Sequence, residues 1–211
     1  MDASFWHQKW ELGEIAFHEG QANSLLVKYF GLLKLVKGSR VFVPLCGKTQ
    51  DIPWLLTQGY EVVGAELSEI AVKELFQELG IEPTISNMGS LIHYQGKNIE
   101  IFVGDIFDVT SGLIKLVDAV YDRAALVALP EAMRCQYTAH LIKITEAAPQ
   151  LMICFEYDQS VMAGPPFSIN PEEVMGHYES TYSLSLIESC DVEGGLKGKA
   201  MASEMVWLLT D

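Results

Sequence analysis

The feature that most constrains the fold is a strand–turn–helix–strand unit that ends at Glu66. Val41 to Leu45 is an unbroken apolar run, which predicts a strand buried in a parallel sheet. Gly47 then permits a tight turn in which backbone can approach a ligand closely. A helix over 50–58 and a second apolar strand over 60–65 follow. This order is typical of a nucleotide-binding βαβ unit, in which the terminal acid accepts hydrogen bonds from ribose hydroxyls.

The glycine turn narrows the class of ligand. The dinucleotide fingerprint needs three glycines and this turn has one, so an ordinary α/β crossover that ends in an acid remains the alternative. Gly47-Lys48-Thr49 matches the end of a P-loop, but that motif needs a glycine five residues before Gly47, where the chain has Phe42. The turn therefore predicts a nucleoside without a polyphosphate.

Charge and length bound the function. A chain of 211 residues, 49% of them hydrophobic, predicts one packed domain over residues 1–211. The net charge is −14, and the 14 Lys and Arg residues are scattered along the chain, which argues against nucleic acid and against an anionic membrane surface as partners. No apolar stretch reaches the length of a transmembrane helix.

Cysteine and histidine spacing suggests neither disulfides nor a metal. The four cysteines lie far apart without a C-x-x-C pair, and the first residues lack the pattern of a secretory signal, so we expect a reduced, cytoplasmic protein. The five histidines match no ligand spacing, and no metal is expected. The cysteines are Cys46, Cys135, Cys154 and Cys190, and the histidines are His7, His18, His93, His140 and His177.

Aromatic residues are concentrated in the first 36 residues, for which a helical leader is predicted. Trp6, Trp10 and Phe17 could form a lid that excludes water and stacks on a flat acceptor. The alternative is that they only attach the first helix to the sheet.

The rest of the chain alternates strands and helices. Helices are expected over 68–79 and from Pro130 to Pro149, and strands over 99–103, 118–122 and 151–157. Two last strands, over 182–190 and 204–209, are joined by a glycine-rich segment, which is typical of an antiparallel hairpin. The fold class is therefore α/β: a mostly parallel sheet that ends in a C-terminal antiparallel hairpin.

Charged residues follow successive predicted strands. In open α/β sheets ligands bind beyond the carboxyl ends of the strands, where Glu66, Asp105 and Arg123 are expected. Glu66 suits a ribose diol, whereas Asp105 and Ile106 suit the polar edge and the face of an adenine. The alternatives are a turn cap for Asp105 and a local ion pair for Asp122 with Arg123.

Seven segments in this order resemble the thiopurine S-methyltransferase family over nearly the whole chain, and the length and start resemble its bacterial branch. The Pro-Leu-Cys-Gly-Lys turn is the most specific of them, because most S-adenosylmethionine enzymes have a glycine-rich sequence there. The segments are Phe5-Trp6, Trp10, Phe17-His18, Val43–Lys48, Val62–Glu69, Tyr121–Leu126 and Gly164–Phe167.

The resemblance implies a class I, Rossmann-like methyltransferase sheet and S-adenosylmethionine as methyl donor. It implies a cofactor site formed by Trp10, Leu45, Gly47, Glu66, Asp105, Ile106 and Arg123. It also implies that Phe17 covers the substrate and that Arg123 activates it; His18, as the neighbour of Phe17, could touch the substrate too. Some family members have a second arginine late in the chain, where this sequence offers only Lys197 and Lys199. Lysine lacks the planar fork of arginine, so the substrate preference stays open.

The expected activity is S-methylation of small thiols or thiopurine-type aromatic acceptors by a monomer, in a detoxifying role. Selenium or tellurium species are further candidate acceptors in a bacterial cell. Two alternatives use the same βαβ unit. One is a nicotinamide-dependent oxidoreductase, and the other is a non-catalytic sensor that binds a nucleoside.

Overall fold

A single mixed sheet organises the structure, a computed structural model that describes residues 3–15 and 18–211. Within these residues nine strands pair in the order β3-β4-β5-β2-β1-β6-β7-β9-β8. The strands are β1 (Arg40–Pro44), β2 (Glu61–Glu66), β3 (Thr84–Met88), β4 (Leu91–Gly96), β5 (Ile99–Val103), β6 (Ala119–Arg123), β7 (Gln150–Tyr157), β8 (Ser183–Asp191) and β9 (Ala202–Thr210).

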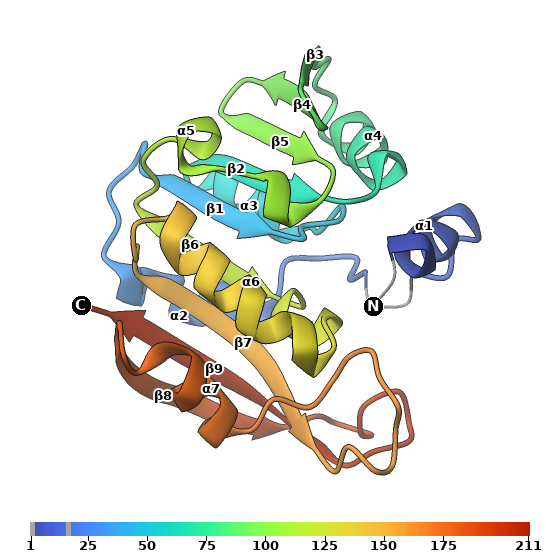
Figure 1. The fold of residues 1–211 in the computed structure, drawn as a ribbon, viewed down its shortest axis with the longest axis vertical. Helices are drawn as coiled ribbons and strands as arrows, with labels where there is room; N and C mark the ends of the chain where they lie inside the picture. The colour runs from blue at the N-terminus through green and yellow to red at the C-terminus, as the bar shows by residue number, and fades with distance from the viewer. Residues whose placement is uncertain (1–2, 16–17) are drawn as a thin grey trace.

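The five central strands, β5, β2, β1, β6 and β7, are parallel, and antiparallel strands flank this group on both sides. β9 pairs with β7 and then with β8, which confirms the predicted C-terminal hairpin. β3 and β4 form a second antiparallel pair beside β5. Because the parallel strands share one direction, their carboxyl ends lie at one edge of the sheet, on the right in Figure 1.

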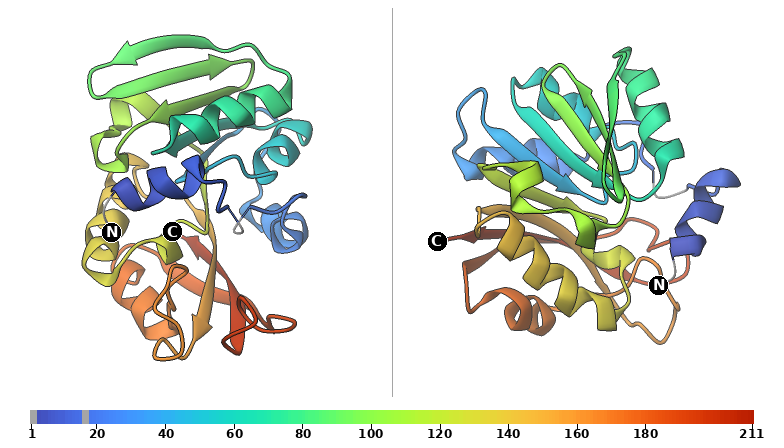
Figure 2. Two further views of the ribbon diagram at one scale, coloured as in Figure 1. Left: turned by 90° about the vertical axis from the view of Figure 1, so that its right-hand side faces the viewer. Right: turned by 45° about the horizontal axis from the view of Figure 1, so that its top comes forward.

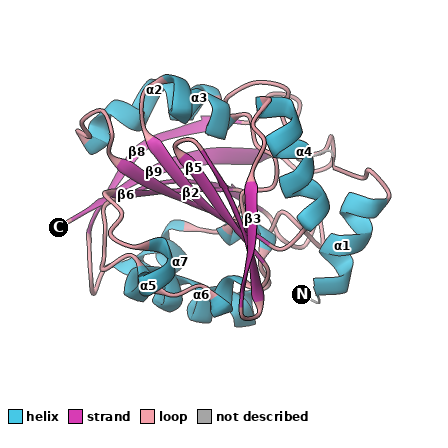
Figure 3. Cartoon of the chain, turned by 90° about the horizontal axis from the view of Figure 1, so that it is seen from above, coloured by secondary structure: helices cyan, strands magenta, loops and turns pink. Residues whose placement is uncertain are grey.

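Helices cover both faces of the sheet (Figure 3). One face packs on α2 (Ser24–Tyr29), α3 (Asp51–Thr57) and α4 (Glu69–Leu79), with apolar side chains such as Leu26, Ile52 and Leu75. The other packs on α5 (Ser111–Ile114), α6 (Glu131–Ile144) and α7 (Pro171–Tyr178). The 3-10 turns are η1 (Phe30–Leu33), η2 (Ile106–Asp108) and η3 (Leu126–Ala128). No helix in the described ranges is long and apolar enough to cross a membrane.

The leader is less helical than predicted. α1 (Ala3–Glu11) and α2 are separate helices, and the described residues between them form turns and irregular backbone. Asn23 caps the start of α2, and its side chain accepts hydrogen bonds from the amides of Leu25 and Leu26. α7 was not predicted, although Asn170 caps it and Pro171 is its first residue.

Asp122 lies in the hydrophobic core and forms no local ion pair with Arg123, so that alternative is wrong. Its side chain is fully buried and accepts hydrogen bonds from the Tyr137 hydroxyl (2.6 Å) and the Leu126 amide (3.2 Å). It thereby links β6 to α6 and to the turn after β6. Burial raises the pKa of the Asp122 carboxyl from 3.8 to about 6, although both hydrogen bonds oppose the change.

We expect the Asp122→Asn variant to gain stability relative to wild type as the pH rises. A folded-state pKa above the unfolded value contributes stability that is complete below the unfolded value and is lost as the pH passes the folded value. The free energy of unfolding of the variant minus that of wild type should therefore increase by about 2 kcal/mol between about pH 4 and pH 7, which is most of the whole effect of about 3 kcal/mol at about 1.4 kcal/mol per pKa unit. Urea unfolding at several pH values measures this, and a difference that does not change with pH would contradict it.

Candidate active site

The predicted site residues lie at the carboxyl ends of four adjacent strands. Leu45 follows β1, Glu66 ends β2, Asp105 follows β5 and Arg123 ends β6. α1 lies beyond the arrowheads of β1 and β5 in Figure 1 and crosses in front of the strand ends in the left view of Figure 2. The parallel sheet therefore brings together residues that are up to about 80 positions apart in the chain.

The turns that leave these strands have unusual backbone conformations. Leu45 (φ 47°) after β1 and Ala124 (φ 61°) after β6 are non-glycine residues in the left-handed region. Gly47 (φ 53°), in the same turn as Leu45, is in this region too. Left-handed backbone costs roughly 1 kcal/mol or more for a residue with a Cβ, and such residues cluster at ligand sites. Two of the four strand ends thus carry local strain where a ligand is expected.

Glu66 closes the turn after β1. Its Oε2 accepts a hydrogen bond from the Gly47 amide (2.7 Å) and its Oε1 accepts one from the Ser68 amide (2.8 Å), while 6% of the residue is exposed. Burial raises the pKa of the Glu66 carboxyl, and the amides of Ser68, Gly47 and Leu67 oppose that rise. A carboxylate has about four lone-pair sites, so two amides leave acceptor capacity for a ligand's hydroxyl groups.

Trp10 lies directly on the same turn. A Cβ built on Gly47 would lie 3.1 Å from Cζ2 of Trp10, so the ring fills the space that only a glycine leaves free. Trp10 is buried, and it belongs to α1. Phe17 lies outside the described residues, and His18 is half-buried in the segment after α1.

Arg123 faces two carboxylates. Its Nη2 forms an ion pair with Glu19 of the leader, and its Nη1 lies 3.7 Å from Oδ2 of Asp51 in α3. The Arg123 side chain is 11% exposed and that of Glu19 is 46% exposed. The leader therefore contacts the strand ends through Trp10 at β1 and through Glu19 at β6. Neither Glu19 nor Asp51 was predicted from the sequence.

Asp105 and Ile106 have different surroundings. Asp105 is exposed and caps η2, because its side chain accepts a hydrogen bond from the Phe107 amide (3.0 Å). The turn-cap interpretation is therefore confirmed. Ile106 packs into the core cluster with 5% of its surface exposed. Its carbonyl accepts a hydrogen bond from His140 of α6 (3.0 Å). The start of η2 is therefore held both by core packing of the Ile106 side chain and by this backbone hydrogen bond.

The Gly164–Phe167 loop lies against the end of β7, where the Tyr157 hydroxyl donates to the Pro166 carbonyl. The Phe167 amide donates to the Val127 carbonyl (2.7 Å), and Lys197 donates to the Pro165 carbonyl (2.7 Å). Burial lowers the pKa of Lys197, and the charges of Lys199 and of Lys9 in α1 act in the same direction. Lys197 thus contacts this loop, and a charge of the leader acts on its pKa.

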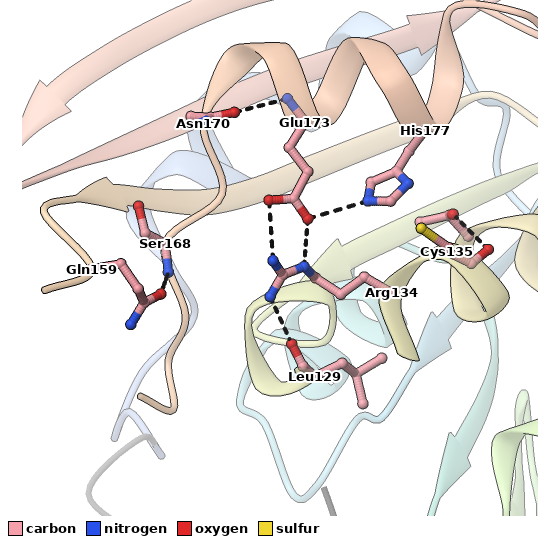
Figure 4. Close-up of polar contacts among 9 residues, drawn as sticks. Leu129, Arg134, Cys135, Gln159, Ser168, Asn170, Glu173 and His177 are labelled. Carbon is pink, nitrogen blue, oxygen red and sulfur yellow. Dashed lines mark hydrogen bonds and ion pairs between the residues drawn. The ribbon is translucent and has the colours of Figure 1, made fainter. Parts of the chain in front are cut away.

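Arg134 supports the same loop from α6. Its guanidinium lies 5.8 Å from the centre of the Phe167 ring and forms an ion pair with Glu173 of α7. Figure 4 shows this pair together with the hydrogen bond from Arg134 to the Leu129 carbonyl (3.0 Å). Buried arginine was another feature that sequence patterns did not indicate. Among the described residues, no group of three or more His, Cys, Asp or Glu side chains could hold a metal ion.

We expect Gly47→Ala to loosen α1, because the added methyl would meet the Trp10 ring. Gly80→Ala is the matched control, since Gly80 has a similar φ of 65° but no atom within 4 Å of an added Cβ. Both variants should lose about 1 kcal/mol of stability from left-handed strain. Only Gly47→Ala should increase the rate of tryptic cleavage at Lys9. Equal cleavage rates in the two variants would contradict the contact.

Comparison with known proteins assigns the family. The model of the thiopurine S-methyltransferase (TPMT) family matches residues 1–210. The chain is 53% identical to a thiopurine S-methyltransferase of Xanthobacter autotrophicus over 210 residues, covering 99% of each chain. It is 49% identical to that of Gluconobacter oxydans, covering 98% of this chain and 94% of the relative.

Solved structures agree on the fold. A methyltransferase of Burkholderia thailandensis with bound 1,6-didemethyltoxoflavin and S-adenosylhomocysteine matches with a TM-score of 0.67 and 15% identity, over 99% of this chain and 87% of that one. Magnesium protoporphyrin IX methyltransferase of Synechocystis PCC 6803 matches with a TM-score of 0.64 and 11% identity over the full length of both. The fold is that of class I methyltransferases, and fold and family together indicate S-adenosylmethionine as the cofactor. The chain belongs to the thiopurine S-methyltransferase family.

Proposed function

We propose that this methyltransferase transfers the methyl group to the sulfur of a small, flat thiol of the thiopurine type, taken in its anionic form. The observation that supports this most directly is the Arg123 guanidinium, which lies at the strand ends and already binds a carboxylate, that of Glu19. A site that binds one anion can accept a thiolate in its place. The names of the relatives, at up to 53% identity, support the same class of acceptor.

Position and charge are what the chain itself must supply. When bound, S-adenosylmethionine provides a methyl group on a positively charged sulfur, which leaves as a neutral thioether with the electron pair of the broken C–S bond. The acceptor sulfur forms the new C–S bond from the opposite side and needs no general acid. Arg123 would lower the pKa of an acceptor thiol within about 4–6 Å by roughly 1–3 units, which increases the thiolate fraction. Selenium and tellurium acceptors would use the same guanidinium.

The roles of the other site residues are part of the proposal. Glu66 accepts hydrogen bonds from the ribose hydroxyls, and the turn that contains Leu45 and Gly47 borders the cofactor. Trp10 covers the sulfonium, where a cation–π contact contributes about 0.5–2 kcal/mol. The segment at Asp105 and Ile106 borders the adenine. Because the Ile106 side chain is mostly buried, the backbone of η2 would make most of that contact.

The acceptor side is assigned to the leader and the C-terminal loops. Phe17 and His18 would lie over the acceptor, and residues 1–36 would act as a lid on a single catalytic domain. Lys197 would supply a second positive charge, since it lies against the Pro165 carbonyl and near α1. Its single ammonium gives less directional recognition than an arginine fork, so we expect a broad acceptor range.

We also propose that the protein acts as a detoxifying monomer in the cytoplasm. Its four cysteines are all free, as expected in a reducing compartment. Cell fractionation and analytical ultracentrifugation test this part separately. A dimer in solution would contradict the proposed monomer, and a secreted protein would contradict the proposed location. Neither outcome would change the proposed methyl transfer.

A mass-spectrometric screen of acceptors tests the activity. The purified protein is incubated with S-adenosylmethionine and thiopurines, aryl and alkyl thiols, selenite and tellurite, and products heavier by one methyl group are sought. Methylated thiopurines or aryl thiols support the proposal. Binding of S-adenosylhomocysteine without turnover of any acceptor would favour the sensor alternative instead.

We expect Glu66→Ala to weaken binding of S-adenosylhomocysteine roughly ten- to hundred-fold. The substitution removes charge-assisted hydrogen bonds worth about 1.5–3 kcal/mol each. Isothermal calorimetry on the folded variant measures the dissociation constant. Glu69→Gln is the control, because Glu69 forms its contacts with Tyr94 and Lys73 instead of with the turn after β1. An unchanged constant for Glu66→Ala would exclude the assigned role.

We expect Arg123→Lys to impair turnover more than cofactor binding. Lysine keeps the charge but loses the planar fork, so kcat/KM for the acceptor should fall roughly ten- to hundred-fold. Arg40→Lys is the control, since Arg40 begins β1 and forms ion pairs with Glu61 and Glu100 near the opposite edge of the sheet. Equal losses in turnover and in S-adenosylhomocysteine affinity would restrict Arg123 to the cofactor.

A further inference from the structure

Asp51 is a buried carboxylate that joins three elements behind Arg123. Its Oδ1 accepts a hydrogen bond from the Asn23 amide at the start of α2 (2.7 Å). Its Oδ2 accepts one from the Tyr121 hydroxyl of β6 (3.0 Å) and lies 3.7 Å from Nη1 of Arg123. Asp51 itself is the first residue of α3 and is 1% exposed. Both of its oxygens are therefore used, and none of these partners belongs to the cofactor residues assigned above except Arg123.

The geometry of β6 explains why Tyr121 and Arg123 meet the same carboxylate. Residues two apart on a strand project from the same face, so the two side chains lie side by side above α3. Burial raises the pKa of the Tyr121 hydroxyl well above its usual value, and the negative charge of Asp51 raises it further. Tyr121 thus stays protonated and keeps donating to Asp51.

The two carboxylates that face Arg123 differ in how easily they can leave it. The Glu19 side chain is 46% exposed and belongs to the leader, so water can replace Arg123 as its partner. The Asp51 side chain is 2% exposed, and its release from Arg123 would leave a buried carboxylate with hydrogen bonds but without its ion-pair partner. Glu204 of β9 is another charged group whose pKa responds to Arg123: burial raises that pKa and Arg123 opposes the rise.

We propose that Asp51 is the positioning residue of Arg123: it holds the guanidinium at the end of β6 while an anionic acceptor replaces Glu19. The proposal rests on the function proposed above, because it assigns Arg123 to the acceptor. With both carboxylates in place the guanidinium faces two negative charges, and an incoming thiolate would be repelled. After Glu19 leaves, one Arg123 nitrogen remains beside Asp51 and the other is free for the acceptor sulfur. Asp51 also binds the Asn23 amide, so it fixes the start of α2 and Arg123 to one point.

Asp51→Asn tests the proposal, because it removes the charge and nearly conserves the shape. The first readout does not need turnover. 6-Mercaptopurine is titrated by ultraviolet absorption in the complex with S-adenosylhomocysteine, which reports the pH at which its sulfur becomes a thiolate. In the variant this midpoint should move to higher pH by roughly one unit, since a displaced guanidinium stabilises the thiolate less. A move to lower pH would overturn the proposal, because it would mean that Asp51 acts only as an opposing charge.

Turnover supplies the second readout. A misplacement of about 1 Å can lower a rate about hundred-fold, so kcat should fall by that order while the dissociation constant of S-adenosylhomocysteine changes less than about three-fold. Asp51→Glu should recover part of kcat. Equal losses of cofactor affinity and kcat, or no loss of kcat, would overturn the positioning role.

Two further variants keep the test decisive. Glu19→Gln makes the same change of charge on the other carboxylate and should lower KM for the acceptor without moving the thiol midpoint to higher pH. Tyr121→Phe removes one donor to Asp51 and should move the midpoint in the same direction as Asp51→Asn by a smaller amount, which serves if Asp51→Asn does not fold. A midpoint in Tyr121→Phe equal to that of wild type would then overturn the proposal. A wild-type protein that neither binds nor methylates 6-mercaptopurine would overturn the proposed function with it, whereas an active wild type with an unaffected Asp51→Asn overturns this inference alone.

Discussion

The two hydrogen bonds that Glu66 accepts from the backbone amides of Gly47 and Ser68 determine how the whole edge of the sheet is arranged. They draw the turn after β1 against the end of β2, and a buried carboxylate keeps those amides from needing water. With that turn fixed, Gly47 presents a flat surface to Trp10, and α1 can lie across the strand ends. The position of the leader therefore depends on an acid that ends a strand about fifty residues later in the chain.

A second set of contacts, of a different chemical kind, attaches the leader at β6. At β1 the contact is an aromatic ring on glycine backbone, whereas at β6 it is a charge pair between Glu19 and Arg123. The ring contact excludes water and changes little with salt. The charge pair is partly exposed, so salt weakens it. These two contacts of the leader thus respond differently to solution conditions, and an anionic ligand would compete with the charge pair and not with the ring contact.

Local patterns identified most of the sheet and helix framework. Unbroken apolar runs predicted the central strands because parallel strands are buried on both faces, and Ser68 and Gly80 delimited α4 as expected. α7 was missed although Asn170 and Pro171 carry a start signal, since its apolar stripe is short. In the leader, the aromatic weight favoured helix where the chain turns between α1 and α2.

The candidate site was predictable only in part. Glu66 and Arg123 follow from their places after apolar strands, and the family comparison then supplied the reaction class and favoured methyl transfer over the nicotinamide-dependent alternative. Glu19 and Asp51 could not be found in this way, because they meet Arg123 across 104 and 72 positions of sequence and match no motif. The predicted place of Ile106 at the adenine stays a prediction, and the sequence did not indicate that its side chain also packs into the core. Strand-end position predicts where a side chain starts, and packing decides which way it turns.

The nine-residue length of α1 has a thermodynamic consequence. Helices shorter than about 12–15 residues are only marginally stable in water on their own. α1 therefore depends on its packing against the strand ends to remain helical. Any molecule that passes Trp10 would have to displace this helix from the strand ends. The displacement of the helix would be a local unfolding reaction. The conformational entropy gained when α1 unfolds would offset part of the free energy of the contacts that are broken. The affinity for a ligand that enters past Trp10 would therefore change more steeply with temperature than the affinity of a rigid cleft.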